Sequence, residues 1–322
     1  MTAAASRRRV LPAWLAALLA ACTGATVPLQ SRVNGELGDR LADPVSAALV
    51  SFGGGLAVLV VVATVLPSVR RGLGRLPGAV RRRELPPGYL LAGTVGAILV
   101  LTQSAVVALV GVAVFTVAVV AGQTISGLLT DAVGFAQDVR RRPTRARLVG
   151  AGLVLVAVAL SASASLTDRP WVEVVVPAVL PLVAGLLTGF QHAANARVGA
   201  VAGTPLTAVV TNFVAGTLAL LIAAAVRGRG VPDALPPEWW LYTGGLYGMV
   251  FIAGSAALVP HAGVLVVGLG TIAGQLLASL ALDVLAPVAG SVVSLPTVAG
   301  TVLALVAILV ASHRTGRLRR GR

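Results

Sequence analysis

The segment QSRVNGELGDRLADPVSAALVSF, which runs from Gln30 to Phe52, has a second copy in the same chain. That copy, QHAANARVGAVAGTPLTAVVTNF, runs from Gln191 to Phe213 and aligns without a gap at an offset of 161 residues. Gln, Asn, Gly, Pro, Ala and Phe recur, whereas most charged residues of the first copy do not. Self-similarity at a fixed offset predicts that the chain contains two copies of one structural unit.

The similarity continues downstream, where the offset becomes 152 residues. The segment AGQTISGLLTD, from Ala121 to Asp131, matches AGQLLASLALD, from Ala273 to Asp283. We therefore expect two units that divide the chain into residues 1–166 and 167–322.

The composition indicates an integral membrane protein. The chain of 322 residues is 57% hydrophobic and 11% charged, with a mean hydropathy of +0.93, whereas an ordinary soluble domain is about 25% charged. The apolar residues form unbroken runs, which favour an all-α membrane fold over an alternating β-barrel pattern. Ten runs are long enough to span a membrane: Val10–Leu29, Val45–Leu66, Gly88–Val110, Val112–Gly134, Leu148–Leu166, Val172–Phe190, Pro205–Val226, Trp239–Val259, Gly263–Ala286 and Val292–Ser312.

Ten runs in two units give five helices to each unit. Because five is an odd number, the second unit enters the membrane from the side opposite to the first. Such inverted-topology repeats are typical of secondary transporters, in which the two halves exchange conformations to give alternating access. The third and fourth runs nearly touch at Gly111, and the eighth and ninth at Pro260–Gly263, so each pair predicts a tight helical hairpin.

The arginines predict the orientation in the membrane. All 25 basic residues are Arg; with the N-terminus in the cytoplasm, 20 fall on the inside and 5 on the outside, as the positive-inside rule requires. We therefore expect both termini in the cytoplasm and a location in a bacterial-type inner (plasma) membrane. The clusters Arg81–Arg83 and Arg140–Arg142 are expected to contact anionic lipid, which explains the net charge of +14 without a nucleic-acid partner.

The first run allows a second interpretation. A basic start, an apolar stretch and Leu19-Ala20-Ala21-Cys22 resemble a lipoprotein signal with Cys22 as the lipidated residue. We favour a spanning helix, because the apolar run continues to Leu29 and because the repeat requires a helix here.

The repeated residues also carry a resemblance. The pattern comprises Gln30, Asn34, Pro44, Ala47, Phe52, Gly55, Ala121, Gly122, Gln123 and Asp131. It resembles the YdcZ-type family of the drug/metabolite transporter superfamily, and the chain looks like a tandem fusion of two family units. The resemblance implies a ten-helix permease that exports a small molecule, and it implies nothing about which molecule.

Repeated amides are the first candidates for the transport pathway. Gln30 and Asn34 are four residues apart and share one helical face, and Gln191 and Asn195 repeat this spacing. These amides either bind polar groups of a substrate or hold helices together by hydrogen bonds.

Further polar candidates lie along later runs. Gln123 and Gln275 correspond to each other and lie beside small residues, and Ser51 corresponds to Asn212. Gln103 has a serine as its counterpart. For these residues too, a pathway role and a packing role both remain open.

The eleven acidic residues are expected in loops or at helix ends. Asp131 and Asp283 are expected to reach the membrane interface, and the charges of the first copy (Arg32, Glu36, Asp39, Arg40 and Asp43) to form a solvated loop. An intramembrane ionisable residue is the usual sign of proton coupling. Its absence here argues against a proton antiporter and against cationic substrates.

Other function classes find little support. His192, His261 and His313 are scattered and there is one cysteine, so we expect neither a metal site nor a cofactor. No set of nucleophile, acid and base is evident, so the chain is not predicted to be an enzyme. The remaining alternative is a membrane scaffold or accessory subunit that does not transport.

Overall fold

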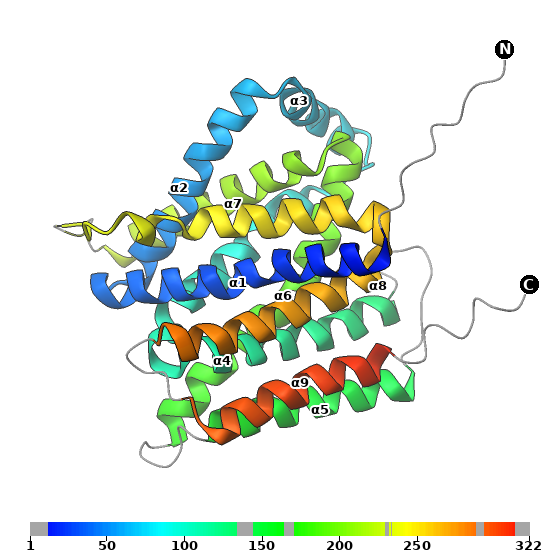
Figure 1. Cartoon of the computed structure of the whole chain (residues 1–322). Helices are drawn as coiled ribbons and strands as arrows, with labels where there is room; N and C mark the ends of the chain where they lie inside the picture. The colour runs from blue at the N-terminus through cyan, green and yellow to red at the C-terminus, as the bar shows by residue number, and fades with distance from the viewer. Residues whose placement is uncertain are drawn as a thin grey trace, which may run out of the picture.

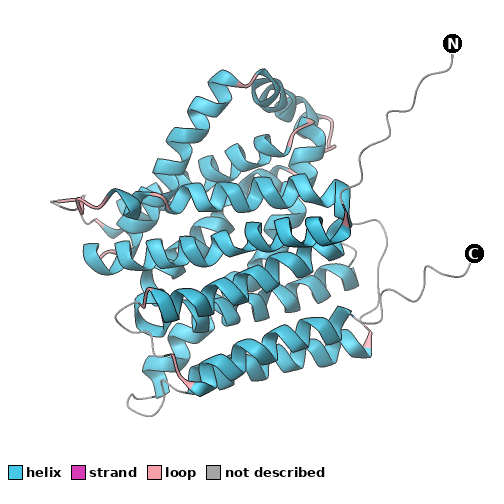
Figure 2. Cartoon of the chain, in the orientation of Figure 1, coloured by secondary structure: helices cyan, strands magenta, loops and turns pink. Residues whose placement is uncertain are grey.

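The computed structural model describes residues 12–133, 144–163, 171–228, 232, 234–287 and 293–312, and these residues form helices joined by turns and short connections (Figure 1 and Figure 2). No strand occurs among them. The helices are α1 (Ala13–Leu41), α2 (Pro44–Val65), α3 (Pro67–Arg81), η1 (Pro87–Leu91), α4 (Gly93–Val133), α5 (Arg145–Ser163), α6 (Trp171–Ala202), α7 (Pro205–Arg227), η2 (Trp239–Tyr242), α8 (Gly244–Leu285) and α9 (Leu295–Ser312).

The long helix α4 is broken at Gly111, which has φ 82° and ψ 166°. Its 41 residues would measure about 62 Å if straight, which is twice the hydrocarbon thickness of a bilayer. Only glycine adopts such a backbone conformation readily. The expected separation of the third and fourth runs at Gly111 is confirmed.

The chain of α8 also reverses direction. Along its first half, Gly248 lies against Gln30 and Gly254 against Thr23, so this half runs antiparallel to α1. Its far end returns to the same end of α1, where the carbonyl of Ala286 accepts a hydrogen bond from Arg32. The two halves of α8 therefore form a hairpin that holds α1 (Figure 1). The side chain of His261, expected in this turn, lies outside the described residues.

The helices fit a membrane-spanning fold. Within the described residues, five stretches are long and apolar enough to cross a membrane: Trp14–Leu41, Pro44–Val65, Pro87–Leu129, Pro205–Arg227 and Val267–Leu285. The third of these covers two crossings, because α4 is broken at Gly111. Large apolar side chains such as Val61 and Ile222, which are 60% and 64% exposed, cover outward faces. The predicted all-α membrane fold is confirmed.

The segment expected to be a solvated loop after Leu29 is helical, and that prediction was wrong. α1 continues through the charged residues to Leu41, and Ala42 follows in the left-handed conformation. Arg32, Glu36 and Arg40 are spaced four residues apart and form ion pairs along the helix, which stabilises it. Asp43 then starts α2, because its carboxylate accepts hydrogen bonds from the backbone N–H groups of Val45 and Ser46.

The additional helix α3 was not among the ten runs. Its buried residues Val69, Gly72, Leu76 and Ala79 follow a helical spacing and face the bundle. The arginines lie on its other faces. One of them, Arg75, donates a hydrogen bond to the carbonyl of Ala202 at 3.0 Å. A basic amphipathic helix of this kind is typical of a membrane surface.

Small residues let the two sequence copies interlock. A Cβ built on Gly24 in α1 would collide with the backbone of Thr271 in α8, and a Cβ on Gly185 in α6 would collide with the backbone of Val119 in α4. One turn away, the corresponding close contacts are Gly274 with Ala21 and Gly122 with Leu182. The first helix of each copy therefore crosses the fourth helix of the other copy, as close approach of small residues permits.

Two further contacts join equivalent helices. Phe52 in α2 stacks on Phe213 in α7, and these residues correspond to each other in the repeat. α5 and α9, the last helices of the two copies, lie side by side (Figure 1), where Gly300 packs against Ala157 and Ser161. A pseudo-two-fold axis thus passes between α2 and α7 and between α5 and α9.

Candidate functional site

A buried hydrogen-bond network joins α1 to the first half of α4. The Nδ2 of Asn34 donates to Oε1 of Gln103 at 2.7 Å, and the Nε2 of Gln103 donates to Oγ of Ser31 at 3.0 Å. Asn34, Gln103 and Ser31 are each 0% exposed. Together with the neighbouring Gln30 and Ser51, these residues are called the first amide cluster. Four of the five candidate residues predicted for the first half of the chain therefore lie in this cluster: Gln30, Asn34, Ser51 and Gln103.

A corresponding network joins α6 to α7 in the second copy. The Nε2 of Gln191 donates to Oδ1 of Asn212 at 2.9 Å. The Nδ2 of Asn212 donates to Oδ1 of Asn195, and also to the carbonyl of Ala208 at 2.8 Å. Gln191, Asn195 and Asn212 are called the second amide cluster. Each of these three residues was a separate candidate in the sequence, and the structure brings them into contact.

Each cluster reaches the opposite sequence copy through its glutamine. Gln30 of α1 lies against Gly248 of α8, and Gln191 of α6 lies against Gly96 of α4. At both glycines an added Cβ would fall 2.8 Å from the Nε2 of the glutamine, which is closer than side chains tolerate. The amide side chains are therefore placed at the boundary between the two copies, where relative movement of the copies must alter their surroundings.

The Phe52–Phe213 pair lies at this boundary as well. The ring centroids are 5.0 Å apart with an interplanar angle of 36°. A Cβ on Gly96 would fall 3.4 Å from Phe52 and 2.8 Å from Gln191, so the aromatic pair adjoins the second cluster. The two phenyl rings therefore form an apolar contact on the pseudo-two-fold axis, between α2 and α7.

The predicted residues Gln123 and Gln275 do not belong to either cluster. Gln275 is 1% exposed, and its Oε1 has no hydrogen-bond partner among the described residues. Gln123 is half-buried in α4. Each follows a glycine, Gly122 or Gly274, that packs directly on another helix, so these two glutamines lie at the helix crossings.

Sequence reasoning did not identify Ser31, although Ser31 accepts a hydrogen bond within the first cluster. Its counterpart in the repeat is His192, which is exposed. The candidates were amides and the counterparts of amides in the repeat, and Ser31 is neither, so this criterion could not find it.

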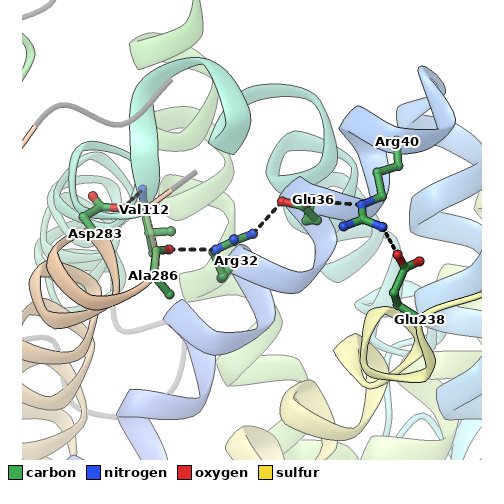
Figure 3. Close-up of polar contacts among 7 residues, drawn as sticks. All are labelled: Arg32, Glu36, Arg40, Val112, Glu238, Asp283 and Ala286. Carbon is green, nitrogen blue, oxygen red and sulfur yellow. Dashed lines mark hydrogen bonds and ion pairs between the residues drawn. The ribbon is translucent and has the colours of Figure 1, made fainter. Parts of the chain in front are cut away.

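The charged end of α1 carries an ion-pair bridge, formed by Arg32, Glu36, Arg40 and Glu238 (Figure 3). Arg32 and Arg40 each approach Glu36 to 2.8 Å. Arg40 also pairs with Glu238, which lies just before η2. The hydrogen bond from Arg40 lowers the pKa of Glu238. The bridge links the first sequence copy to the second.

A second ion pair connects the copies at the same end. The two terminal guanidinium nitrogens of Arg227 in α7, Nη1 and Nη2, donate to the carboxylate of Asp43, with Nη2 and Oδ2 2.7 Å apart. The Arg227 guanidinium holds the pKa of the Asp43 carboxyl well below its usual range, and Ser46 adds to this effect. The expectation that Arg32, Glu36 and Asp43 are only solvated is wrong. Arg32 and Asp43 have partners in the second copy, Ala286 and Arg227, and Glu36 pairs with arginines of its own helix.

Asp283 occupies a different environment from the one expected. It is 4% exposed rather than placed at an interface. One carboxylate oxygen accepts a hydrogen bond from the backbone N–H of Val112 at 3.0 Å (Figure 3). The other accepts from the backbone N–H of Ala113 at 2.7 Å. These N–H groups begin the second half of α4, directly after the break at Gly111, where a helix leaves its first donors unpaired. A carboxylate is well suited to this position, because helix N-termini stabilise negative charge.

Some expected features cannot be placed. The side chain of Asp131 lies outside the described residues, as do Arg140–Arg142 and His313. Within the described residues, no group of three or more His, Cys, Asp or Glu residues is arranged to hold a metal ion.

Comparison with known proteins identifies the family. A family model described as "Putative inner membrane exporter, YdcZ", of the drug/metabolite transporter class, matches residues 15–160 and again residues 176–310. The comparison with curated proteins gave no match. Since the two matched segments cover most of the chain, the chain belongs to the YdcZ family and contains two copies of the family unit. The predicted family and its tandem arrangement are confirmed.

Proposed function

We propose that this member of the YdcZ family exports a small molecule across the inner membrane by alternating access between two inverted five-helix units, residues 1–166 and 167–322. One observation carries the proposal. Gln30 and Gln191 occupy equivalent places in the repeat, and each contacts the third helix of the opposite unit at Gly248 or Gly96. Polar groups placed at such a repeat interface are typical of transporter substrate sites.

The arrangement of helices supports the proposed topology. α1 begins and α9 ends at the same end of the bundle (Figure 1), as an even number of crossings requires. The arginine distribution favours the cytoplasm for that end. The basic helix α3 and Arg81–Arg83 would then lie against anionic lipid at the cytoplasmic surface.

Ion pairs that join the two units at one end of the bundle support alternating access. At the other end of α1, the ion-pair bridge and the Asp43–Arg227 pair hold the two units together. Under the proposed topology this end faces the exterior. Release of substrate to the exterior requires these contacts to break, while the cytoplasmic end closes.

Metabolite profiling in strains that lack or overexpress the protein tests export. Overexpression is expected to raise the extracellular concentration of at least one small molecule, and deletion to lower it. Replacing both Gln30 and Gln191 by Leu is expected to reduce this export at least tenfold, while the amount of protein in the membrane stays unchanged. Thr64→Val is the control, because Thr64 is exposed and its hydroxyl donates to the carbonyl of Val61 in its own helix.

The alternative function has a distinct outcome. A scaffold or accessory subunit would leave extracellular metabolites unchanged in all strains. Export that persists in the double glutamine variant would instead show that the protein transports but that these amides do not line its pathway.

A further inference from the structure

One face of α1 packs tightly against the first half of α4. This face comprises Ser31, Gly35 and Gly38, which are all buried. A Cβ added to Gly35 would collide with the side chain of Val107, and one added to Gly38 would collide with the backbone of Ser104. The small residues therefore let the first and third helices of the first unit touch along this face.

The equivalent face of α6 is not packed in this way. The counterparts of the three α1 residues in the repeat are His192, Ala196 and Gly199, which are called the α6 face. His192 and Ala196 are exposed. A Cβ added to Gly199 would have its nearest neighbours in Thr204 and Pro205, in the turn after α6, with the closest atom at 3.4 Å. This is an ordinary contact distance, so the tight packing seen at Gly38 has no equivalent at Gly199.

The α6 face points toward the first half of α8, which is the counterpart of the first half of α4. The ring of His192 lies 6.2 Å from the ring of Phe251 in α8, measured between centroids. Ser255 of α8 stands at the position of Gln103 in the repeat. The hydroxyl of Ser255 has no hydrogen-bond partner among the described residues, whereas Gln103 bonds to two residues of α1. The contact that closes the first unit is therefore open in the second unit.

The packed face and the open face lie near opposite ends of the bundle. Gly38 precedes the end of α1 at Leu41, which is the end that carries the ion-pair bridge. Gly199 precedes the end of α6 at Ala202, whose carbonyl accepts a hydrogen bond from Arg75 of the basic helix α3. Under the proposed topology, the first of these ends faces the exterior and the second faces the cytoplasm. The structure is thus closed toward the exterior and open toward the cytoplasm.

We propose that the α6 face lines the path by which the exported molecule enters from the cytoplasm, and that this face packs against α8 when α1 separates from α4. The proposal rests on the export function and adds the place of entry. Ala196 and Gly199 are small, as Gly35 and Gly38 are, so α6 can approach α8 as closely as α1 approaches α4. Because inverted repeats exchange conformations, the packed face and the open face change places. A polar molecule that enters here meets the imidazole of His192, which donates or accepts a hydrogen bond.

Labelling of single cysteines tests the entry path. Cys22, the one native cysteine, is replaced by Ala, and either His192→Cys or Ser31→Cys is added. In sealed inside-out vesicles, a membrane-impermeant maleimide is expected to label His192→Cys at least tenfold faster than Ser31→Cys, because the equivalent face of α1 is packed. Right-side-out vesicles should label His192→Cys at least tenfold more slowly. Equal rates for the two cysteines, or faster labelling of His192→Cys from the exterior, would overturn the proposal.

A methyl group at Gly38 should exchange the two accessibilities. Gly38→Ala collides with the backbone of Ser104, so it destabilises the contact between α1 and α4. It is expected to lower the labelling of His192→Cys from the cytoplasmic side at least tenfold and to raise the labelling of Ser31→Cys from the exterior. Gly199→Ala is the matched control at the equivalent position, because its methyl group has room, and it should leave both rates unchanged.

A second variant covers the case in which Gly38→Ala does not fold. Arg227→Gln removes the ion pair with Asp43 at the exterior end and adds no atom to the contact between α1 and α4. It is expected to shift the two labelling rates in the same directions as Gly38→Ala. Faster labelling of both cysteines would indicate general loosening and would contradict the exchange of faces, as would unchanged rates for both.

The labelling experiment does not depend on transport. If the two accessibilities exchange but no strain exports any molecule, the path stands and the export function fails. If a molecule is exported but the accessibilities do not exchange, the export function stands and the α6 face is not its entry path.

Discussion

Phe52 stacks on Phe213, its own counterpart in the repeat, with 5.0 Å between the ring centroids. Because the two residues are equivalent and mutually buried, Phe52→Ala and Phe213→Ala should have similar effects. Each removes the same aromatic contact and leaves a similar cavity, so each is expected to lower stability by about 3–5 kcal/mol. Thermal unfolding in detergent measures this, with the exposed Val61→Ala as control. A loss from only one of the two substitutions would show that the pair does not lie on a symmetry axis.

The helix crossing at Gly274 is expected to tolerate no side chain. Gly274→Ala would force a methyl group into the backbone of Ala21, and overpacking of this kind costs about 1–3 kcal/mol. Gly268→Ala, in the same helix, has free space for its methyl group and should leave the melting temperature unchanged or slightly raised. Equal melting temperatures for the two variants would argue against the close crossing of α1 and α8.

The carboxylate of Asp283 is expected to stabilise the broken helix α4. Asp283→Ala leaves the N–H groups of Val112 and Ala113 buried without their acceptor, at a cost of about 1–3 kcal/mol for each group. Asp283→Asn keeps one acceptor oxygen, so we expect it to recover part of the lost stability. Hydrogen exchange at Val112 and Ala113 reports the same effect locally. Unchanged exchange in Asp283→Ala would mean that the carboxylate does not pair with these groups.

The Asp43–Arg227 ion pair should make stability depend on pH at the acidic end. The pKa of Asp43 is lowered in the folded protein, compared with about 3.9 in an unfolded chain. The pair therefore stabilises the protein fully above that unfolded value, and this contribution falls as pH drops below it. From about pH 6 down to about pH 3, the melting temperature should fall less steeply for Asp43→Asn than for the wild type. Parallel curves would contradict the assignment.

A covalent link between the two units in place of the Arg40–Glu238 ion pair should stop transport. With Cys22 replaced by Ala, cysteines at positions 40 and 238 can be connected in place of the Arg40–Glu238 ion pair. A short bis-methanethiosulfonate reagent joins them through two disulfide bonds and releases two methanesulfinate ions. Export is expected to fall at least tenfold and to recover on reduction. Cysteines at positions 32 and 36, both within α1, are the control, because a cross-link inside one helix leaves the units free to separate. Full export from the cross-linked 40–238 variant would exclude opening at this end.

Much of the fold could be predicted because membrane helices leave a local signal. Apolar runs and the repeat predicted the all-α membrane fold, and Gly111 marked the break in α4 correctly. The true end of α1 was missed because its charges suggested a loop, although the four-residue spacing of Arg32, Glu36 and Arg40 was a helical signal. Polarity alone does not distinguish a loop from a helix that continues beyond the apolar region.

The candidate site was predictable from its amides and from their counterparts in the repeat. Gln191, Asn195 and Asn212 recur as polar positions, and the structure brings them together. Asp283 was misplaced because its partners are backbone groups of another helix, which no sequence pattern near Asp283 reveals.

The interlocking of the two copies has a consequence for synthesis of the protein in the cell. α1 emerges first from the ribosome, but the helix that covers Gly24 belongs to α8, about 250 residues later. Conversely, α4 receives α6 from the second copy at Gly185 and Val119. Neither half can complete its own core, so the first half must wait in the membrane, partly assembled, until the second half has been inserted in the opposite sense. A chain divided between α5 and α6 would therefore need both pieces in the same bilayer to form a stable protein.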